Sequence, residues 1–235
     1  MTDLKNYALD LVRTSQPSFL LLILGNPAGA QGPAFLEWFK GQFRDELRKL
    51  SPVFRARLFE RDGVDITWGR FPPVPMKYLA LVDILGGGPE DAHKVIEFAQ
   101  NAYATEASAG EVATWLYYPV SPKYGLECGD MPTTVMVHYT NPVAGMEAEY
   151  AEWFNTRLLG HAPVFDPLVS AQRFERSMYQ NPGALEPDYQ TVAVYDQVGP
   201  SEQLMEAFKN PPPELLDMVS LDNEHFTESA YLPLV

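Results

Sequence analysis

The sequence has little of what several classes of protein depend on. Its 235 residues include a single cysteine, Cys128, which excludes an internal disulfide and a thiolate-rich metal site. Basic residues number 17 against 31 acidic ones, so the formal net charge is −14. A surface this acidic repels phosphate backbones and anionic lipid headgroups. We therefore expect neither a nucleic-acid partner nor a membrane partner.

Long apolar runs and cofactor motifs are also missing. The apolar run at 19–24 is much shorter than the roughly 20 residues that cross a bilayer, and no signal-peptide pattern surrounds it. The triplet at 86–88 lacks the lysine and hydroxyl residue of a phosphate-binding loop. No Gly-x-Ser-x-Gly elbow and no metal-ligand spacing occurs. The expectation is a cytoplasmic protein with no metal and no other cofactor.

What the chain does contain is an internal repeat. A shift of 115 positions aligns the two halves without a gap over a long stretch. The shift superposes Asn26-Pro27 on Asn141-Pro142, Glu37-Trp38-Phe39 on Glu152-Trp153-Phe154, and Phe59-Glu60-Arg61 on Phe174-Glu175-Arg176. Several matches in the same order indicate a tandem duplication.

Each half predicts the order strand, helix, strand, strand, helix, strand. The strands are expected at 18–24, 53–61, 77–85 and 112–118, and again at 133–140, 168–176, 189–198 and around 229–234. This order predicts an α+β fold of two tandem ferredoxin-like βαββαβ units packed sheet to sheet. The first unit covers 1–120 with an N-terminal helix, the linker covers 121–132, and the second unit covers 133–235. The two units form an internal pseudo-dimer, and further homo-oligomerisation stays open.

His138 is the most informative polar residue in a predicted strand. Strand alternation places Val135, Val137 and Tyr139 on one face and His138 on the other. If the valines face the helices, His138 points into a cavity between the sheets, where a histidine of near-neutral pKa suits acid–base catalysis. The first half has Ile23 at this position, so the two copies differ. A buried histidine that is simply hydrogen-bonded is the competing interpretation.

Other polar residues on the predicted strands are weaker candidates. Asp83 and Asp196 occupy equivalent places late in the third strands, where a carboxylate can orient an imidazole, act as a base, or pair at a strand end. Arg173 can hold a substrate carboxylate or form a salt bridge. Tyr195 can line a pocket and donate a hydrogen bond to an aromatic ligand.

The second half resembles a known superfamily. The segment Thr140-Asn141-Pro142-Val143-Ala144-Gly145-Met146-Glu147-Ala148-Glu149-Tyr150-Ala151-Glu152-Trp153-Phe154-Asn155-Thr156 and the segment 168–174 resemble the EthD-like branch of the dimeric α/β-barrel superfamily. The resemblance implies a range of activities, from cofactor-free oxygenases, polyketide cyclases and lactone isomerases to decarboxylase-like and haem enzymes. The histidine that EthD-like helices carry five residues after the tryptophan is absent, because Leu158 and Phe43 stand there. His161, three residues beyond Leu158, is the substitute candidate.

Together these observations favour a cofactor-independent small-molecule enzyme, either a lyase or decarboxylase or an isomerase. Its substrate is expected to be apolar and aromatic or polyketide-like. The catalytic residues are expected to be His138, Tyr139 and Asp196, and the substrate-binding residues Arg173, Tyr195 and His161. Three alternatives remain: a haem-binding oxidoreductase similar to chlorite dismutases, a cofactor-free monooxygenase, and a non-catalytic ligand-binding module.

Overall fold

The computed structural model describes residues 17–126, 128, 131–159, 165–183, 185–211 and 219–235. The strands are β1 Phe19–Pro27, β2 Val53–Arg61, β3 Tyr78–Ile84, β4 Ala109–Pro119, β5 Tyr124–Gly125, β6 Thr134–Pro142, β7 Leu168–Arg176, β8 Thr191–Gln197 and β9 Leu221–Pro233. The helices are α2 Gly32–Trp38, α3 Arg44–Leu47, α4 Pro89–Thr105, α5 Glu147–Trp153 and α7 Ser201–Ala207, with π-helical turns η1 Phe39–Phe43 and η2 Phe154–Leu158. None of the helices in these ranges has the length and apolar character to cross a bilayer.

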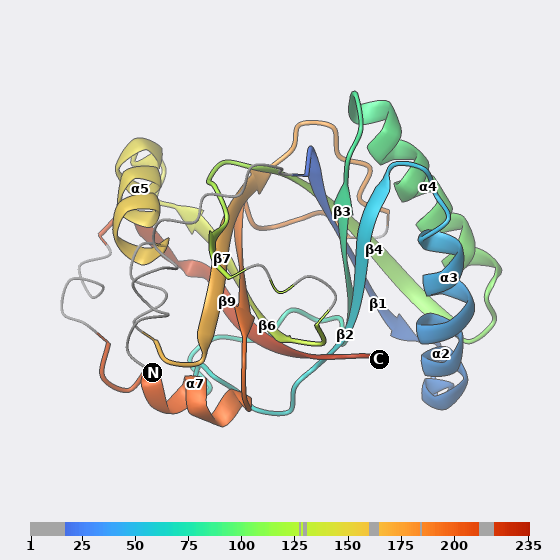
Figure 1. Ribbon diagram of the computed structural model, residues 1–235, viewed down its shortest axis with the longest axis horizontal. Coiled ribbons are helices and arrows are strands. Elements are labelled where there is room, and N and C mark those ends of the chain that lie inside the picture. Colours follow the sequence, from blue (N-terminus) through green and yellow to red (C-terminus); the bar gives the residue numbers. More distant parts are fainter. Residues whose placement is uncertain (1–16, 127, 129–130, 160–164, 184, 212–218) are drawn as a thin grey trace.

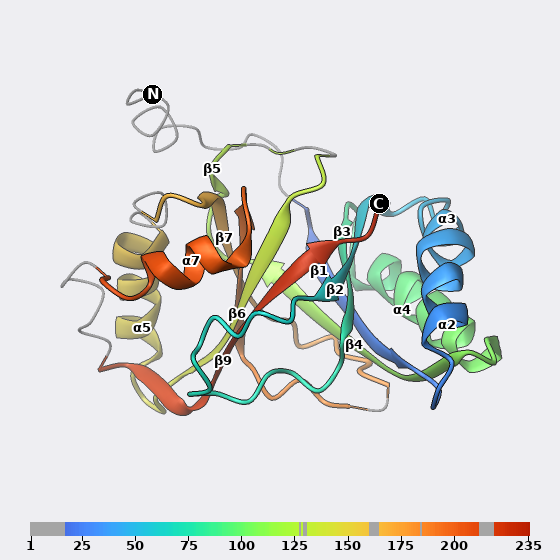
Figure 2. The ribbon, with the colours of Figure 1, turned by 90° about the horizontal axis from the view of Figure 1, so that it is seen from below.

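The strands form one antiparallel sheet that closes on itself. The strand order is β4-β1-β3-β2-β9-β6-β8-β7-β5, and an additional pairing of β4 with β7 completes the ring. Figure 1 shows the sheet in the centre, with α2, α3 and α4 on one outer side and α5 on the other. Figure 2 places α7 on the same side as α5. The fold is therefore α+β, with helices outside a closed sheet.

The elements of the two halves recur at constant distances in the sequence. Strands β1 and β6, the π-turns η1 and η2, and strands β2 and β7 each begin 115 residues apart, since Phe19, Phe39 and Val53 correspond to Thr134, Phe154 and Leu168. The junctions between the halves follow the same rule. Strand β2 pairs with β9 only over 59–61, and β7 pairs with β4 only over 174–176.

Local sequence explains why these elements form. Strand β1 is a run of leucine and isoleucine that is buried on both faces, as expected for a strand between a helix layer and a closed interior. Helix α4 begins with Pro89, followed by Glu90 and Asp91 in its first turn. Proline suits the first helical position because its missing N–H would have no partner there, and acidic side chains stabilise the positive end of the helix.

The inside of the closed sheet is an apolar core shared by both halves. Its buried members are Leu20, Leu22, Leu24, Phe59, Val74, Met76, Leu79, Leu81, Ala113, Trp115, Tyr117, Val135, Val137, Tyr139, Phe174, Val192, Val194 and Tyr231. Two separate cores lie between the sheet and the helices of each half. Because the valines of β6 fill the shared interior, the expectation that they face the helices is wrong.

Two further differences from the expectations concern the chain between and before the strands. The range 121–132 contains the short strand β5, which pairs with β7 through Tyr124 and Gly125. The last strand starts at Leu221, well before the expected 229. The N-terminal helix that the sequence predicts at 2–13 lies outside the described residues.

Candidate active site

His138 lies on the helix side of the sheet, which corrects the expectation that it faces the interior. Its strand neighbour Met136 belongs to the core beneath α5 and η2, whereas Val137 points into the closed sheet. The imidazole packs against Phe154, Tyr195 and Phe226, with ring centroids 5.8, 6.3 and 4.8 Å away. Burial lowers the pKa of His138 to about 3, so the ring is neutral near neutral pH.

The acidic residue beside this imidazole is Glu228. It stands opposite His138 in the register of β6 with β9, and its Oε1 lies 3.4 Å from Nε2 of His138. Burial raises the pKa of Glu228 to about 7. A carboxyl group with such a pKa can both accept and release a proton near neutral pH. The pair therefore combines a titrating carboxyl group with a neutral imidazole.

Tyr195 completes the cluster, so the structure brings together two residues that the sequence proposed for the site. Burial raises the pKa of Tyr195, and the nearby charge of Glu228 raises it further. The hydroxyl group of Tyr195 and Nε2 of His138 are both buried and lack a hydrogen bond of good geometry. Unsatisfied buried polar atoms cost free energy and need an explanation such as bound water or a ligand.

These unsatisfied atoms are concentrated in the second half. Of the eight side chains that carry one among the described residues, seven lie between 138 and 229, and only Tyr103 lies in the first half. At the register of His138 and Glu228, the first half pairs Ile23 with Thr114. The hydroxyl group of Thr114 donates to the carbonyl of Asn181, and so it is satisfied. The polar cluster is therefore specific to the second half.

A cavity of about 220 Å³ reaches Glu228 from outside the sheet. Its walls come from β9 and from the segment that follows β2, with the lining residues Arg61, Asp62, Gly63, Val64, Asp65, Ile66, Phe71, Pro73, Glu228, Ser229 and Ala230. The Glu228 side chain is 15% exposed, so it faces the cavity while His138 lies behind it. Small-molecule sites are commonly ≈ 300–1,000 Å³, so this cavity suits a small ligand.

Tyr139 and Asp196 lie on the other face of the sheet from His138. The hydroxyl groups of Tyr139 and Tyr231 are 3.2 Å apart inside the apolar core. Asp196 accepts hydrogen bonds from Arg57 at 2.5 Å and from Lys123 at 2.8 Å. Burial alone would raise the pKa of Asp196, but these two cations hold it far below its usual range. The structure does not bring Tyr139 or Asp196 to the His138 cluster.

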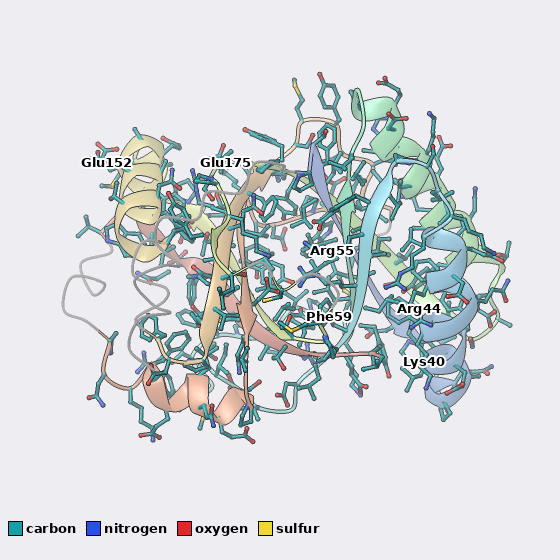
Figure 3. The ribbon with its side chains drawn as sticks, in the orientation of Figure 1. Lys40, Arg44, Arg55, Phe59, Glu152 and Glu175 are labelled. Carbon is teal, nitrogen blue, oxygen red and sulfur yellow. The ribbon has the colours of Figure 1, made fainter. Side chains whose placement is uncertain are left out.

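Arg173 is on the helix side but its guanidinium group is already engaged. It donates to Asn155 and to Glu175, both at 3.0 Å, and it lies 5.8 Å from the Phe154 ring centroid. Figure 3 shows Glu175 between the strands and the helix that carries Glu152. His161 lies outside the described residues.

Neither a metal nor haem fits the described surroundings of His138. The described residues contain no group of three or more His, Cys, Asp or Glu side chains arranged to hold a metal ion. A haem iron would need open space at a ring nitrogen of His138, but Glu228 lies 3.4 Å from Nε2 and the rings of Phe154, Tyr195 and Phe226 pack around the imidazole. The 220 Å³ cavity borders Glu228 and not the imidazole.

The sequence did not reveal Glu228, because the last strand was expected to begin one residue later. The observed strand carries Phe226, Glu228 and Ala230 on one face. If the strand had been predicted to begin earlier, a glutamate between two apolar residues of the same face would have indicated a buried carboxyl group.

Comparisons with known proteins find solved structures that share the fold of this chain. No family model matches the sequence, and no curated protein matches it either. Among solved structures, a "putative monooxygenase" from Fusobacterium nucleatum subsp. nucleatum is similar, with a TM-score of 0.62 and 5% identity over 94% of each chain. An anthrone oxidase-like protein has a TM-score of 0.54 and 12% identity over 96% of this chain and 94% of its own.

A mutant chlorite dismutase from Candidatus Nitrospira defluvii is also similar, with a TM-score of 0.55 and 9% identity over 97% of this chain and 95% of its own. At such low identities the likeness establishes a shared fold and nothing about chemistry. The fold matches a dimeric α/β barrel, with a closed antiparallel sheet and helices outside it.

Proposed function

We propose that the chain is a small-molecule enzyme that moves a proton to or from a substrate carbon atom. The observation that carries this proposal is the Glu228–His138 pair, whose carboxyl group has a pKa of about 7 and borders a cavity. Perturbed titratable groups in a cavity are candidates for acid–base catalysis. The reaction class is isomerase or lyase, including decarboxylase, because both need such a transfer.

Glu228 is the group that exchanges the proton, and His138 is its positioning partner. With a pKa of about 3, His138 is too weak a base to act alone near neutral pH. A neutral imidazole can donate to the Glu228 carboxylate or accept from its protonated form, depending on the tautomer. It can therefore support both states of the carboxyl group during turnover.

The proposed substrate is a small apolar molecule with an aromatic ring. The cavity is bordered by Ile66, Phe71 and Pro73, and Phe71 meets Phe226 edge to face at 4.5 Å. Aromatic walls favour ring-containing ligands through offset and edge contacts. One structural neighbour is named as anthrone oxidase-like, and anthrone is a fused aromatic ketone of this chemical kind.

Hydrogen exchange at carbon tests the proposal without a known product. Anthrone and 2-tetralone are incubated with the protein in deuterated buffer, and loss of the signals of their acidic methylene hydrogens is followed by NMR. These hydrogens lie across the central ring from the carbonyl in anthrone and next to the carbonyl in 2-tetralone. We expect the protein to accelerate the exchange, and the rate to rise as the pH passes through about 7 and Glu228 loses its proton. Glu228→Gln should reduce the rate roughly 10²–10⁴-fold, the usual contribution of a general base.

Glu224→Gln is the matched control, because Glu224 is an exposed residue of the same strand. Its exchange rate should equal that of the wild type. If the ketones bind but no exchange occurs, the non-catalytic ligand-binding alternative is preferred. If the protein instead consumes oxygen when it is incubated with the ketones, the monooxygenase alternative is preferred.

We also propose that the chain is a tandem duplication of a ferredoxin-like unit, within the EthD-like branch. Support comes from the constant offset of 115 residues between β1 and β6, η1 and η2, and β2 and β7. Each half has the strand order of such a unit, β4-β1-β3-β2 and β9-β6-β8-β7. The polar cluster of the second half then represents specialisation of one copy.

A further inference from the structure

A second cavity, of about 510 Å³, opens at the end of the closed sheet beside β2. Its lining residues are Arg44, Arg48, Val53, Phe54, Arg55, Ala56, Arg57, Leu58, Phe59, Met131, Pro132, Thr133, Pro233, Leu234 and Val235. Four of the chain's 17 basic residues lie here, and the lining includes no aspartate or glutamate. In a chain of net charge −14, a cavity lined in this way is a local positive region.

The floor of this cavity continues into a buried ionic network. Arg55 donates to Asp83 at 2.8 Å, and Arg57 donates to Asp196 at 2.5 Å. A small inner space lined by Arg55 and Arg57 is also lined by Lys123, so its wall carries three cationic side chains and two carboxylates. The cations of the floor are therefore paired with carboxylates, whereas the lining of the outer cavity contains arginines and no acidic side chain.

The outer arginines come from the helix layer. Arg44 has a half-buried side chain with an exposed neighbour, Asp45, at 3.4 Å. Arg48 donates to the carbonyl oxygen of Ala56 at 3.0 Å, which holds its guanidinium group against the edge of β2. Figure 3 shows Arg44 on the helix layer, and Arg55 and Phe59 on the strands that face it.

The cavity lies at one of the two equivalent junctions between the halves. At the junction of β4 and β7, the short strand β5 pairs with Ser170 and Ala171, beside the three-residue pairing of β7 with β4. At the junction of β2 and β9, the corresponding stretch of β2 borders the cavity. Arg48 and the amide of Leu234 already bond the carbonyls of Ala56 and Leu58 there, which disfavours an added peptide strand.

The rim of the cavity is apolar. Phe54 and Met131 are 56% and 57% exposed, and Leu234 also lines the cavity. Exposed large apolar side chains beside a charged floor fit a ligand that has one anionic end and one apolar end. A planar guanidinium group binds a carboxylate through two hydrogen bonds, which favours a carboxylate as the anionic end.

We propose that this cavity is a binding site for a small amphipathic carboxylate, separate from the cavity at Glu228. The carboxylate binds between Arg44 and Arg48 at the mouth, and the apolar body lies against Phe54 and Met131. The site does not depend on the proposed catalytic function, because none of its lining residues borders the Glu228 cavity.

Titration calorimetry at low ionic strength tests the proposal, with 2-naphthoate as the probe and uncharged 2-naphthamide as its analogue. We expect 2-naphthoate to bind at least tenfold more tightly than 2-naphthamide. The double variant Arg44→Gln/Arg48→Gln should weaken 2-naphthoate at least tenfold, and added salt should weaken it as well. Melting curves confirm that each variant is folded.

Two control variants locate the effect. Arg70→Gln removes an exposed arginine that lies outside the cavity, and it should leave the affinity unchanged. Glu228→Gln should also leave it unchanged, which separates this site from the proposed catalytic one. The proposal is overturned if 2-naphthoate does not bind, if 2-naphthamide binds equally well, or if Arg70→Gln weakens binding as much as the double variant. Loss of binding in Glu228→Gln alone would overturn it too.

Discussion

At the residue scale, two buried carboxyl groups show how surroundings set a charge. Asp196 is buried against Arg57 and Lys123, which keep its pKa far below the usual range, so it is ionised. Glu228 is buried with a neutral imidazole as its close neighbour, and burial raises its pKa to about 7. Desolvation disfavours the charged form in both places, and only the adjacent cations reverse its effect. Asp196 is therefore suited to pairing and Glu228 to proton transfer.

The raised pKa of Glu228 predicts how stability changes with pH. The pKa is higher in the folded state, about 7, than the ordinary value of 4.5. Its stabilising contribution is therefore full below pH 4.5 and is lost as the pH rises through 7. Between pH 4.5 and 8, we expect wild type to lose up to about 3 kcal/mol of unfolding free energy relative to Glu228→Gln. Urea unfolding of both proteins at the two pH values measures this difference.

Glu224→Gln again serves as the control for this measurement. It removes an exposed carboxyl group from β9, so its stability should differ from that of the wild type by the same amount at both pH values. Parallel pH profiles for Glu228→Gln and wild type would show that Glu228 is not desolvated.

At the element scale, the short strand β5 depends on one glycine. Gly125 has φ +89°, a conformation that favours glycine, and a Cβ atom there would lie 2.2 Å from the carbonyl oxygen of Val169. This close approach lets β5 run beside β7 and pair with Ser170 and Ala171. Without β5, strand β7 would be held at this edge only by its three residue pairs with β4.

Gly125→Ala tests this dependence. The backbone contacts cannot give way as a flexible side chain could, so we expect a loss of roughly 3 kcal/mol or more in the free energy of unfolding. Gly145→Ala is the control, because Gly145 has φ +85° but nothing within 4 Å of its Cβ position. It should cost only about 1 kcal/mol from backbone strain. Equal losses in urea unfolding would contradict a steric role for Gly125.

At the scale of the whole molecule, the closed sheet makes the two halves depend on each other. Its core combines side chains of both halves, such as Leu22 and Leu81 with Val137 and Val194. The ionic network also crosses between them, because Arg57 is on β2 and Asp196 is on β8. Each half therefore covers an apolar sheet face of the other.

Asp196→Asn tests how much the ionic network contributes to the stability of the closed sheet. The change leaves Arg57 and Lys123 buried without their shared carboxylate, and losing one member of a buried ion pair typically costs about 3–5 kcal/mol. We therefore expect Asp196→Asn to melt at a clearly lower temperature than the wild type. Asp222→Asn, which alters an exposed pair with His225, should cost less than about 1 kcal/mol. A similar melting temperature for both variants would contradict the structural role of Asp196.

The local pattern of the chain determined much of the fold. Alternating and continuous apolar runs placed β1, β2, β3 and their counterparts to within a few residues, because strand formation depends on side chains that are neighbours in sequence. The matching segments 115 residues apart predicted that both halves contain the same elements in the same order. The start of β9 was missed because its first residues, Asp222 to His225, are polar and resemble a loop.

Only the tertiary structure decided which face of each strand is the inside. Alternation separates Val137 from His138, but it does not say which of them meets the helices. The valines of β6 lie inside the closed sheet, where their partners in the shared core come from strands of both halves, such as β1, β4 and β8. That choice places His138 beside Glu228 and Asp196 beside Arg57, pairs that no local pattern contains. Charges and protonation depend on such distant neighbours, and so the chemistry of the site is a property of the folded chain.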